Sequence, residues 1–327
     1  MAAAPAPAAA PAAAPTVSVI VSSYNYRDYV VQAVNSALAQ TAPPLQVIVV
    51  DDGSPDDSWD VLQQAYAGDA RVTLLHQPNG GQMAAWLHAL AHATGDIVAL
   101  LDSDDEWKPD YLERVLRVYR ADASVDYVYC NMEKFGSASG LALTKRRHRR
   151  SRDLGLSMLM GAFVQRWQGV ATSGNTLRCE LLQRILSLPP EQAALWRTRP
   201  DDCLFYGSDI LGAHKVYLAE PLVRHREHAN NALLEFRKSP IKTARYAYRV
   251  ERMLDHYRTL AGCSPYWLKL ARREFQTKPE PSFSEWWMYS GFALHAPTRW
   301  SARFSQLGSI LLHYLRSWRA RGGGPTV

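Results

Sequence analysis

Between Val17 and Asn131 the chain alternates short apolar runs with amphipathic segments, and this alternation restricts the fold more than any other feature of the sequence. The apolar runs are five to seven residues long, rich in Val, Ile and Leu, and lie at 17–21, 45–50, 71–76, 96–101 and 125–131. The segments between them carry apolar residues at helical spacing. Strands that alternate with helices in this way form βαβ units around a mostly parallel sheet. The sequence therefore predicts an α/β fold.

Polar residues follow three of these predicted strands at the point where each ends. They read SSYN at 22–25, DDGS at 51–54 and DSDD at 102–105. Ligands of open α/β sheets bind beyond the carboxyl ends of the strands. We therefore expect the chemistry of the molecule at this one edge.

The aspartates of DSDD admit two interpretations. They could form a solvated turn that starts a helix, because carboxylates complement the helix dipole. They could instead hold Mg²⁺ or Mn²⁺, which take oxygen ligands and complete their shell with water and substrate phosphates. A bound cation would relieve the mutual repulsion of these acids, and Asp102 and Asp104 have the spacing of a DxD motif.

The other two polar ends and one glycine-rich loop also have a structural and a functional interpretation. The residues of DDGS are typical of a turn, but a carboxylate there could accept hydrogen bonds from a nucleobase or a ribose. Tyr24 could pack, or stack on a base. The loop NGGQ at 79–82 opens a predicted helix, where backbone amides suit a phosphate. It matches neither the dinucleotide fingerprint nor the Walker pattern.

Composition excludes several classes of protein. The net charge of +6 fits an anionic partner without naming one, and no basic segment resembles a nucleic-acid-binding module, so no nucleic-acid partner is expected. The four cysteines are scattered, which favours a reducing compartment. No run reaches the ~20 apolar residues of a membrane span. Residues 1–15, rich in Ala and Pro, are expected to be a disordered tail.

Beyond Asn131 the pattern is weaker. Residues 132–155 contain the basic run KRRHRR (145–150), which we expect in an exposed, mobile loop or gripping an anionic acceptor or lipid surface. From about Ala232 the chain is expected to be helical. The last of these helices carries aromatic and basic residues, so it could dock on the rest of the chain or on a partner subunit, or it could lie on a membrane surface.

The order of these motifs closely resembles that of family-2 glycosyltransferases with the GT-A fold. The resemblance is strong over 17–120 and weaker over 172–231, where RPDDCLFYGSDI stands at the place of a Glu-Asp motif and EPLVRHREHANN resembles a closing strand. It implies a Rossmann-like, mostly parallel central sheet flanked by helices, with a helical C-terminal extension. The expected parts are the tail 1–15, a catalytic domain 16–231 (nucleotide-sugar half 16–131, acceptor half 132–231) and the extension 232–327.

The resemblance also assigns expected roles. Asp202 would be the catalytic base, with Asp201 replacing the usual Glu of the pair. Asp104, Asp102 and His228 would hold the metal, with His225 as an alternative histidine. Asp105 and Glu106 would serve the turn and the helix start. The residues expected at the nucleotide sugar are Ser22, Tyr24, Asn25, Asp51, Asp52, Gly81, Gln82, Asp102 and Ser103.

The function implied is an inverting transfer of a sugar, with a divalent cation (Mg²⁺ or Mn²⁺), from a nucleotide-diphosphate donor, preferentially a UDP-sugar, to a hydroxyl of a saccharide or polyprenyl-linked acceptor. Such enzymes assemble cell-surface polysaccharide or glycolipid, so we expect a cytoplasmic protein, in contact with the membrane surface if its last helix lies there. The family often has an Arg-Asn pair where this chain has Trp86-Leu87. That departure keeps open an inactive nucleotide-sugar-binding scaffold subunit. A nucleotidyltransferase, the second alternative, would want a Gly-rich basic loop after the first strand.

Overall fold

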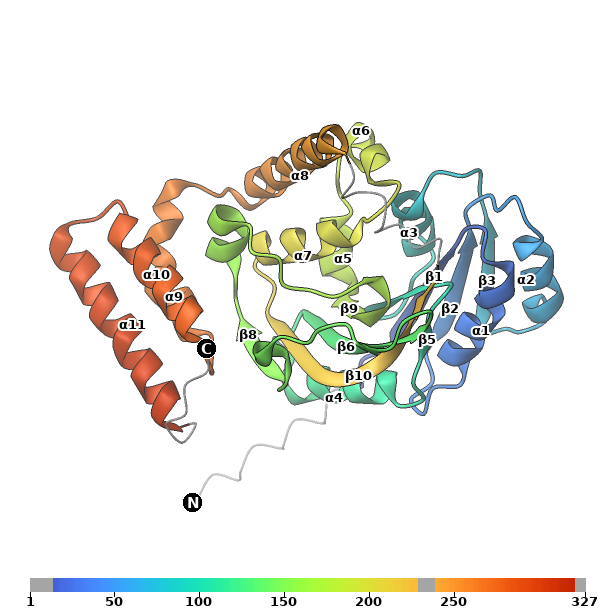
Figure 1. The fold of residues 1–327 in the computed structure, drawn as a ribbon, viewed down its shortest axis with the longest axis horizontal. Helices are drawn as coiled ribbons and strands as arrows, with labels where there is room; N and C mark the ends of the chain where they lie inside the picture. Colours follow the sequence, from blue (N-terminus) through green and yellow to red (C-terminus); the bar gives the residue numbers. More distant parts are fainter. Residues whose placement is uncertain (1–13, 229–238, 321–327) are drawn as a thin grey trace, which may run out of the picture.

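The computed structural model describes residues 14–228 and 239–320. Figure 1 shows a central sheet with helices on both sides, and a group of C-terminal helices beside it. The first half consists of alternating strands and helices: β1 (Val17–Ser23), α1 (Arg27–Leu38), β2 (Gln46–Asp51), α2 (Ser58–Tyr66), β3 (Val72–His76), α3 (Gln82–Leu90), β4 (Ile97–Asp102), β5 (Glu106–Trp107), α4 (Tyr111–Ala121) and β6 (Tyr127–Gly136). The predicted alternation of strands and helices is confirmed.

The second half adds strands to the same sheet. Its elements up to the undescribed gap are β7 (Gly140–Leu141), β8 (Arg152–Gly155), β9 (Asn175–Arg178), α5 (Cys179–Ile185), α6 (Pro190–Ala193), α7 (Asp201–Ile210) and β10 (Lys215–Glu227). After the gap come α8 (Pro240–Ala261), α9 (Ala271–Gln276), α10 (Phe283–His295) and α11 (Trp300–Ala320). The domain boundary expected between 231 and 232 lies outside the described residues.

Strand pairing places the polar strand ends side by side. The strand order is β3-β2-β1-β4-β9-β6-β10-β5. Strands β1 to β4 pair in parallel, so Ser22 stands opposite Asp102, and Ser23 opposite Asp51. The short strand β9 runs antiparallel to both β4 and β6, which makes the sheet mixed. Because the interiors of β1, β2 and β4 are almost wholly buried, only their ends are available to a ligand.

Two helix starts differ from what the residues predict, which is a helix capped by Asp28 and a helix from Lys108 with Pro109 in its first turn. Helix α1 begins at Arg27, with Tyr26 rather than Asp28 at the capping position, and Asp28 lies in the first turn. Helix α4 begins at Tyr111, so Pro109 precedes the helix instead of lying in its first turn. The two shifts are of two and three residues, close to the one or two residues by which helix ends are ordinarily uncertain.

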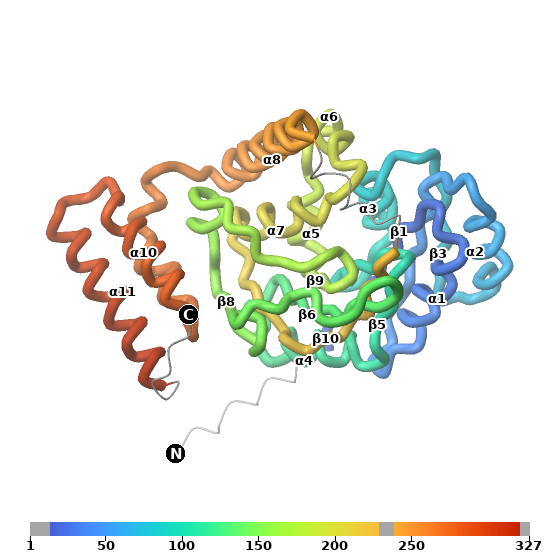
Figure 2. The backbone as a smooth tube through the Cα atoms, viewed as in Figure 1, coloured from blue at the N-terminus to red at the C-terminus, as the bar shows by residue number. Residues whose placement is uncertain are grey.

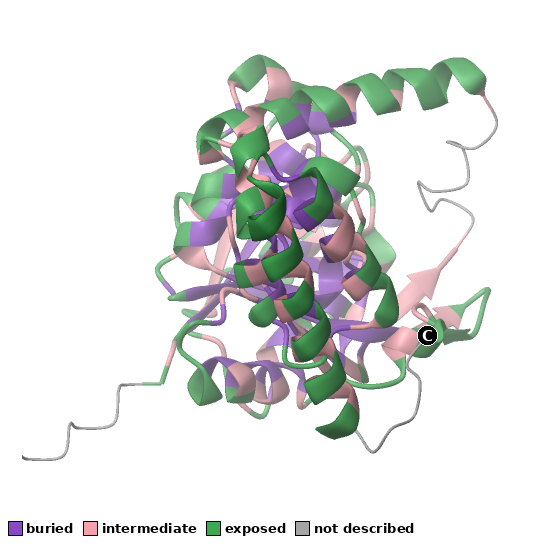
Figure 3. Ribbon diagram, turned by 90° about the vertical axis from the view of Figure 1, so that its left-hand side faces the viewer, coloured by how far each residue is buried: buried purple, intermediate pink, exposed green. Residues whose placement is uncertain are grey.

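Helices α9, α10 and α11 form a layer of their own against the side of the sheet-bearing part, residues 14–228 (Figure 1). Their small core joins Phe275, Tyr289 and Ile310 to Leu159 and Met160 of the segment after β8. In helix α11 one face packs and the other does not. Ile310 is buried, whereas Leu311 and Leu315 are exposed, and Figure 3 shows this helix with much of its surface open. Docking, the first interpretation of the helix, is therefore correct for the face that carries Ile310.

Buried charges fix this layer to the sheet-bearing part. The ammonium group of Lys278 donates to the Leu154 carbonyl (2.5 Å) and the Ser157 hydroxyl (3.1 Å). It lies 3.9 Å from the Glu285 carboxylate, which also accepts from Arg152 at 3.0 Å. Burial alone would raise the pKa of Glu285, but the two cations outweigh it and hold the pKa at about 2. The extension is thus attached by polar contacts as well as by its apolar core.

We expect Lys278→Met to lower the free energy of unfolding by about 3 kcal/mol, because it leaves the Leu154 carbonyl and part of the Glu285 charge without a partner. Urea denaturation followed by circular dichroism measures this. The control is Lys269→Met, since that side chain is exposed and its substitution should cost less than about 0.5 kcal/mol. Equal stability of the two variants would contradict the anchoring role.

Candidate active site

Three carboxylates converge at the end of β4. Asp102, Asp104 and Asp105 each offer an oxygen within 4.8 Å of the others. The chain turns sharply here, since the Asp105 amide donates to the Asp102 carbonyl at 3.1 Å. Burial, together with the neighbouring carboxylates, raises the pKa of both Asp102 and Asp104. Such a cluster gains stability from any cation that neutralises it.

The three acids have different surroundings. Asp105 is almost fully buried and accepts from the Ser173 hydroxyl (2.6 Å) and the Arg226 amide (2.8 Å), with His225 at 3.1 Å. Asp104 lies 3.0 Å from the ring of His228. These contacts tie Asp105 to the turn and to β10. Asp102, which accepts from the Gln82 side chain at 2.6 Å, and Asp104 instead line the cavity described below.

The donor set fits a hard divalent cation. Carboxylate oxygens of Asp102 and Asp104 are the ligands such ions prefer. The hydroxyl of Ser103, between them, is buried and has no hydrogen-bond partner in the described structure. An orphaned polar atom at this point indicates room for a ligand or its water shell. Asp102 and Asp104, with His228 beside them, are the residues that would hold the ion.

A cavity of about 620 Å³ opens in front of these acids. Its size is that of a small-molecule site. It is walled by the ends of β1, β2 and β4, by the start of α3 and by the segments before β9 and α7. The side chains and glycine on its wall that bear on ligand binding are Ser22, Ser23, Tyr24, Tyr26, Asp52, Asn79, Gly81, Gln82, Asp102, Ser103, Asp104, Thr172, Arg197, Arg199, Asp201 and His225.

Asp52 shapes the glycine-rich loop of this wall. Its carboxylate accepts from the backbone amides of Gly80 (2.8 Å) and Gly81 (2.7 Å), and from the Gln77 side chain (2.7 Å). Gly81 has φ +89°, and a Cβ there would come within 2.4 Å of the Arg197 backbone. Only glycine fits such a position without strain. The loop therefore comes close to Arg197 and forms one side of the cavity.

Most residues expected at the nucleotide sugar line this cavity, but two do not. Asp51 is buried and lies 3.0 Å from His76, and it accepts from the backbone amide of Ser54 at 3.1 Å. The backbone amide of Asn25 donates to the Ser54 hydroxyl at 2.9 Å. Both hold the DDGS turn in place instead of facing the cavity. The expected residues that do line it are Ser22, Tyr24, Asp52, Gly81, Gln82, Asp102, Ser103 and Asp104.

The acidic pair at the start of α7 differs from expectation. Asp201 lines the cavity, whereas Asp202 points elsewhere: it is 1% exposed, accepts from the Tyr246 hydroxyl at 2.5 Å and lies 3.6 Å from Arg199. Successive residues of a helix point about 100° apart, so only one of the pair can face the cavity. Burial and the neighbouring Asp202 raise the pKa of Asp201 to about 7. The geometry thus speaks against Asp202 as the residue that faces the substrate.

The cavity also contains residues that the sequence analysis did not single out. Arg197 and Arg199 bring positive charge to the wall that also carries the acids, and Tyr26 and Asn79 line the same cavity. The two arginines lie two and four residues before Asp201, and that proximity was the signal available in the sequence. Trp86, at the place of the Arg-Asn pair, is fully buried, so no cation of α3 takes that role.

Comparison with known proteins agrees with this architecture. The model of glycosyl transferase family 2 matches residues 18–185, which is more than half of the chain. A glycosyltransferase of Nostoc sp. is 35% identical over 222 residues, 66% of this chain and 66% of that protein. The chondroitin synthase of Pasteurella multocida is 36% identical over 113 residues, 35% of this chain and 12% of that protein.

Among solved structures, residues 1–349 of TarS of S. aureus in complex with UDP-GlcNAc superpose with a TM-score of 0.54 at 18% identity, covering 94% of this chain and 74% of that one. This shows that the fold is shared. The matched part of the chain thus covers 66% of the length of the Nostoc protein and 12% of the length of the chondroitin synthase. In its described part no helix is both long and apolar enough to cross a membrane.

Proposed function

Because this chain belongs to glycosyltransferase family 2, we propose that it transfers a sugar from a nucleotide-diphosphate donor to an acceptor hydroxyl with inversion at the anomeric carbon. The observation that carries the proposal is one cavity that contains the Asp102–Asp104 carboxylates, two arginines and Asp201. The relatives support it: one is a chondroitin synthase, and TarS was solved with UDP-GlcNAc. A UDP-sugar is accordingly the proposed donor, and a saccharide or polyprenyl-linked saccharide the proposed acceptor.

The residues divide between the two ends of the donor. Tyr24, 45% exposed at the rim, offers a ring on which a base can stack. Asp52 and Ser22 lie beside it at the ends of β2 and β1. The diphosphate would lie between Asp102–Asp104 and the two arginines, Arg197 and Arg199. A divalent cation on the two carboxylates would supply charge neutralisation of the leaving group.

The acid of α7 completes the chemistry. As the acceptor oxygen bonds to the anomeric carbon, the bond from that carbon to the diphosphate breaks, and the acceptor proton passes to Asp201. A base must be ionised before it can accept that proton. The raised pKa of Asp201, about 7, makes it a stronger base than an ordinary carboxylate at neutral pH. Asp202 serves as a positioning residue, because it holds Tyr246 and Arg199 near the site.

We predict that Asp201→Asn lowers the rate of transfer by about 100-fold or more, since the acceptor proton loses its base. Binding of the donor, measured by calorimetry, should change little. Asp202→Asn is the matched comparison: it should retain most of the transfer rate and lose stability through the weakened Tyr246 contact. The opposite ranking of the two variants would restore Asp202 as the base.

The same assignment predicts a pH profile. Transfer at saturating substrate should rise with pH through about 7, because Asp201 accepts a proton only in its ionised form. The residual transfer rate of Asp201→Asn should not show this rise with pH. Retention of the rise in that variant would assign it to another group.

For the metal, we predict that Asp104→Ala abolishes the Mn²⁺-dependent part of UDP binding. Titration calorimetry with UDP in Mn²⁺ and in EDTA measures this part as a difference. Asp60→Ala, an exposed aspartate of α2, is the control for loss of one negative charge. If UDP binding by Asp104→Ala still responds to Mn²⁺ as the wild type does, the cation lies elsewhere.

Slow metal-dependent release of UDP from a UDP-sugar would also separate an enzyme from an inactive scaffold subunit.

Contact with a membrane surface is the last part of the proposal. Helix α11 exposes Trp300 (63%) and Phe304 (62%), with Arg303 stacked 4.4 Å from the Trp300 ring. Aromatic and basic groups together suit an anionic headgroup layer. We predict that the wild type sediments with vesicles containing phosphatidylglycerol, and that Trp300→Ser with Phe304→Ser does not. Tyr266→Ser, equally exposed but on another segment, is the control. Equal sedimentation of all three would remove membrane contact from the proposal.

A further inference from the structure

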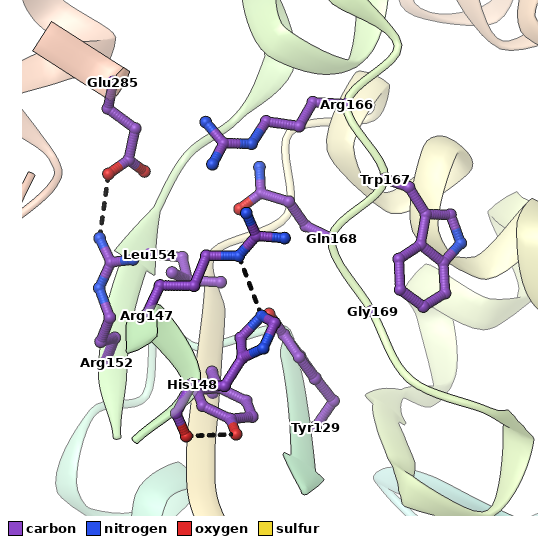
Figure 4. A pocket seen from close by; sticks show the side chains of 11 residues that line it. Tyr129, Arg147, His148, Arg152, Leu154, Arg166, Trp167, Gln168, Gly169 and Glu285 are labelled. Atoms are coloured by element: carbon purple, nitrogen blue, oxygen red, sulfur yellow. Dashed lines mark hydrogen bonds and ion pairs between the residues drawn. The ribbon is translucent and has the colours of Figure 1, made fainter. Parts of the chain in front are cut away.

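A second, smaller cavity lies in the sheet-bearing part, on the side that faces the C-terminal helices. Figure 4 shows the guanidinium groups of Arg147 and Arg166 and the amide of Gln168 directed into one space, with Arg152 at its edge. Arg147 and His148 belong to the KRRHRR run, for which the sequence predicted an exposed loop. Both are only partly exposed here, because Arg146–His148 forms a short helical turn and the Tyr217 hydroxyl donates to the His148 carbonyl at 2.9 Å.

The three arginines have too few anionic partners. Arg152 pairs with Glu285, which Lys278 also approaches. The Nε of Arg147 donates to the ring of His148 at 3.0 Å, a neutral partner. Among the described residues, Arg166 contacts the Ser284 hydroxyl at 3.5 Å and the Met288 sulfur at 4.0 Å, and the charge of Glu285 favours its ionised form without forming an ion pair. Within the described residues, no carboxylate lies within 4 Å of the guanidinium groups of Arg147 or Arg166. The cavity therefore carries excess positive charge.

Two further donors of the wall have no partner among the described residues, while the Glu285 carboxylate, which also lines the cavity, is already paired with Arg152 and approached by Lys278. Burial and the surrounding arginines lower the pKa of His148 to about 4, so its ring is neutral. Because Nε2 accepts from Arg147, the proton is on Nδ1, which is buried without a partner. The side-chain nitrogen of Gln168 is likewise buried and unpaired. The cavity thus contains two unpaired N–H donors and two arginines without a carboxylate partner. An acceptor that entered the cavity would satisfy these groups.

From this donor set we propose that the cavity binds a tetrahedral oxyanion, a phosphate group or an ion of the same chemistry. Guanidinium groups match such oxygens with charge-assisted hydrogen bonds. The space open to the centre of a water-sized sphere is about 30 Å³. That is more than the ~10–15 Å³ needed by one water and too little for a nucleotide. The ligand is therefore a small group, separate from the donor of the large cavity.

The position of this site relative to the large cavity suggests a role. Trp167, Gln168 and Gly169 line the small cavity, and Ala171 and Thr172 line the large one. Two residues of extended chain span at most about 7 Å, so the backbones of the two walls are close neighbours. In Figure 2 this light-green segment, before β9, runs from the side of the C-terminal helices toward the middle of the sheet. Given the proposed transfer reaction, a phosphate carried by the acceptor would bind here while its sugar enters the large cavity.

Binding is tested first without catalysis. At constant ionic strength, replacing chloride with inorganic phosphate should raise the melting temperature of the wild type by several degrees, because the ion binds only the folded state. Arg147→Gln with Arg166→Gln should lose this shift. Arg149→Gln with Arg150→Gln, two exposed arginines of the same basic run, should keep it. No shift in the wild type, or the same shift in both double variants, would overturn the proposal.

The source of the oxyanion is tested with a sugar phosphate. If N-acetylglucosamine 1-phosphate reproduces the shift and N-acetylglucosamine does not, the site accepts a phosphate borne by a saccharide. If only inorganic phosphate acts, the site holds a free ion; both results support an oxyanion site. Metal-dependent hydrolysis of a UDP-sugar should be unchanged in Arg147→Gln with Arg166→Gln. Loss of hydrolysis in the wild type itself would count against the proposed function and leave the anion measurements unaffected.

Discussion

The buried carboxylate of Asp105 is the interaction on which the catalytic edge depends. It joins the end of β4 to the Ser173 hydroxyl before β9 and to the Arg226 amide near the end of β10. Burial alone would lower the pKa of His225, but Asp105, with Asp104 and Asp102 behind it, outweighs burial and raises that pKa to about 9. The Ser173 hydroxyl also accepts from the Asp102 amide at 3.0 Å. One buried acid therefore connects three segments and fixes the position at which Asp102 and Asp104 face the cavity.

This arrangement separates structural acids from acids that remain available. Asp51 and Asp105 are satisfied by the protein, and each holds a turn at a strand end. Asp102, Asp104 and Asp201 surround the cavity with raised pKa values, which marks groups whose charges the protein alone does not compensate. The same contrast distinguishes the basic residues. Arg152 is paired with the Glu285 carboxylate, whereas Arg147 and Arg166 meet around a cavity that this carboxylate lines without pairing with them.

Much of the fold was predictable because its cause is local. The β-branched runs specify strands, the helical spacing specifies crossovers, and parallel pairing then brings SSYN, DDGS and DSDD to one edge. The order of motifs identified the family correctly. Side-chain direction was not predictable to the same degree. Consecutive residues such as Asp51 and Asp52, or Asp201 and Asp202, differ in which of them faces the cavity, and no motif records that orientation.

The sequence by itself determined the parallel strands, the acidic strand end and the helical C-terminal extension, since each follows from a pattern within one segment. Only the tertiary structure decided which acid of α7 reaches the cavity, because that depends on the rotation of the helix against Tyr246. It also decided that Arg197 and Arg199 supply the positive charge absent from α3. The basic run was expected in an exposed loop, but Arg147 and His148 line a cavity. Packing brings Arg166 and Gln168, about twenty residues away in the sequence, beside them, and no local pattern records that contact.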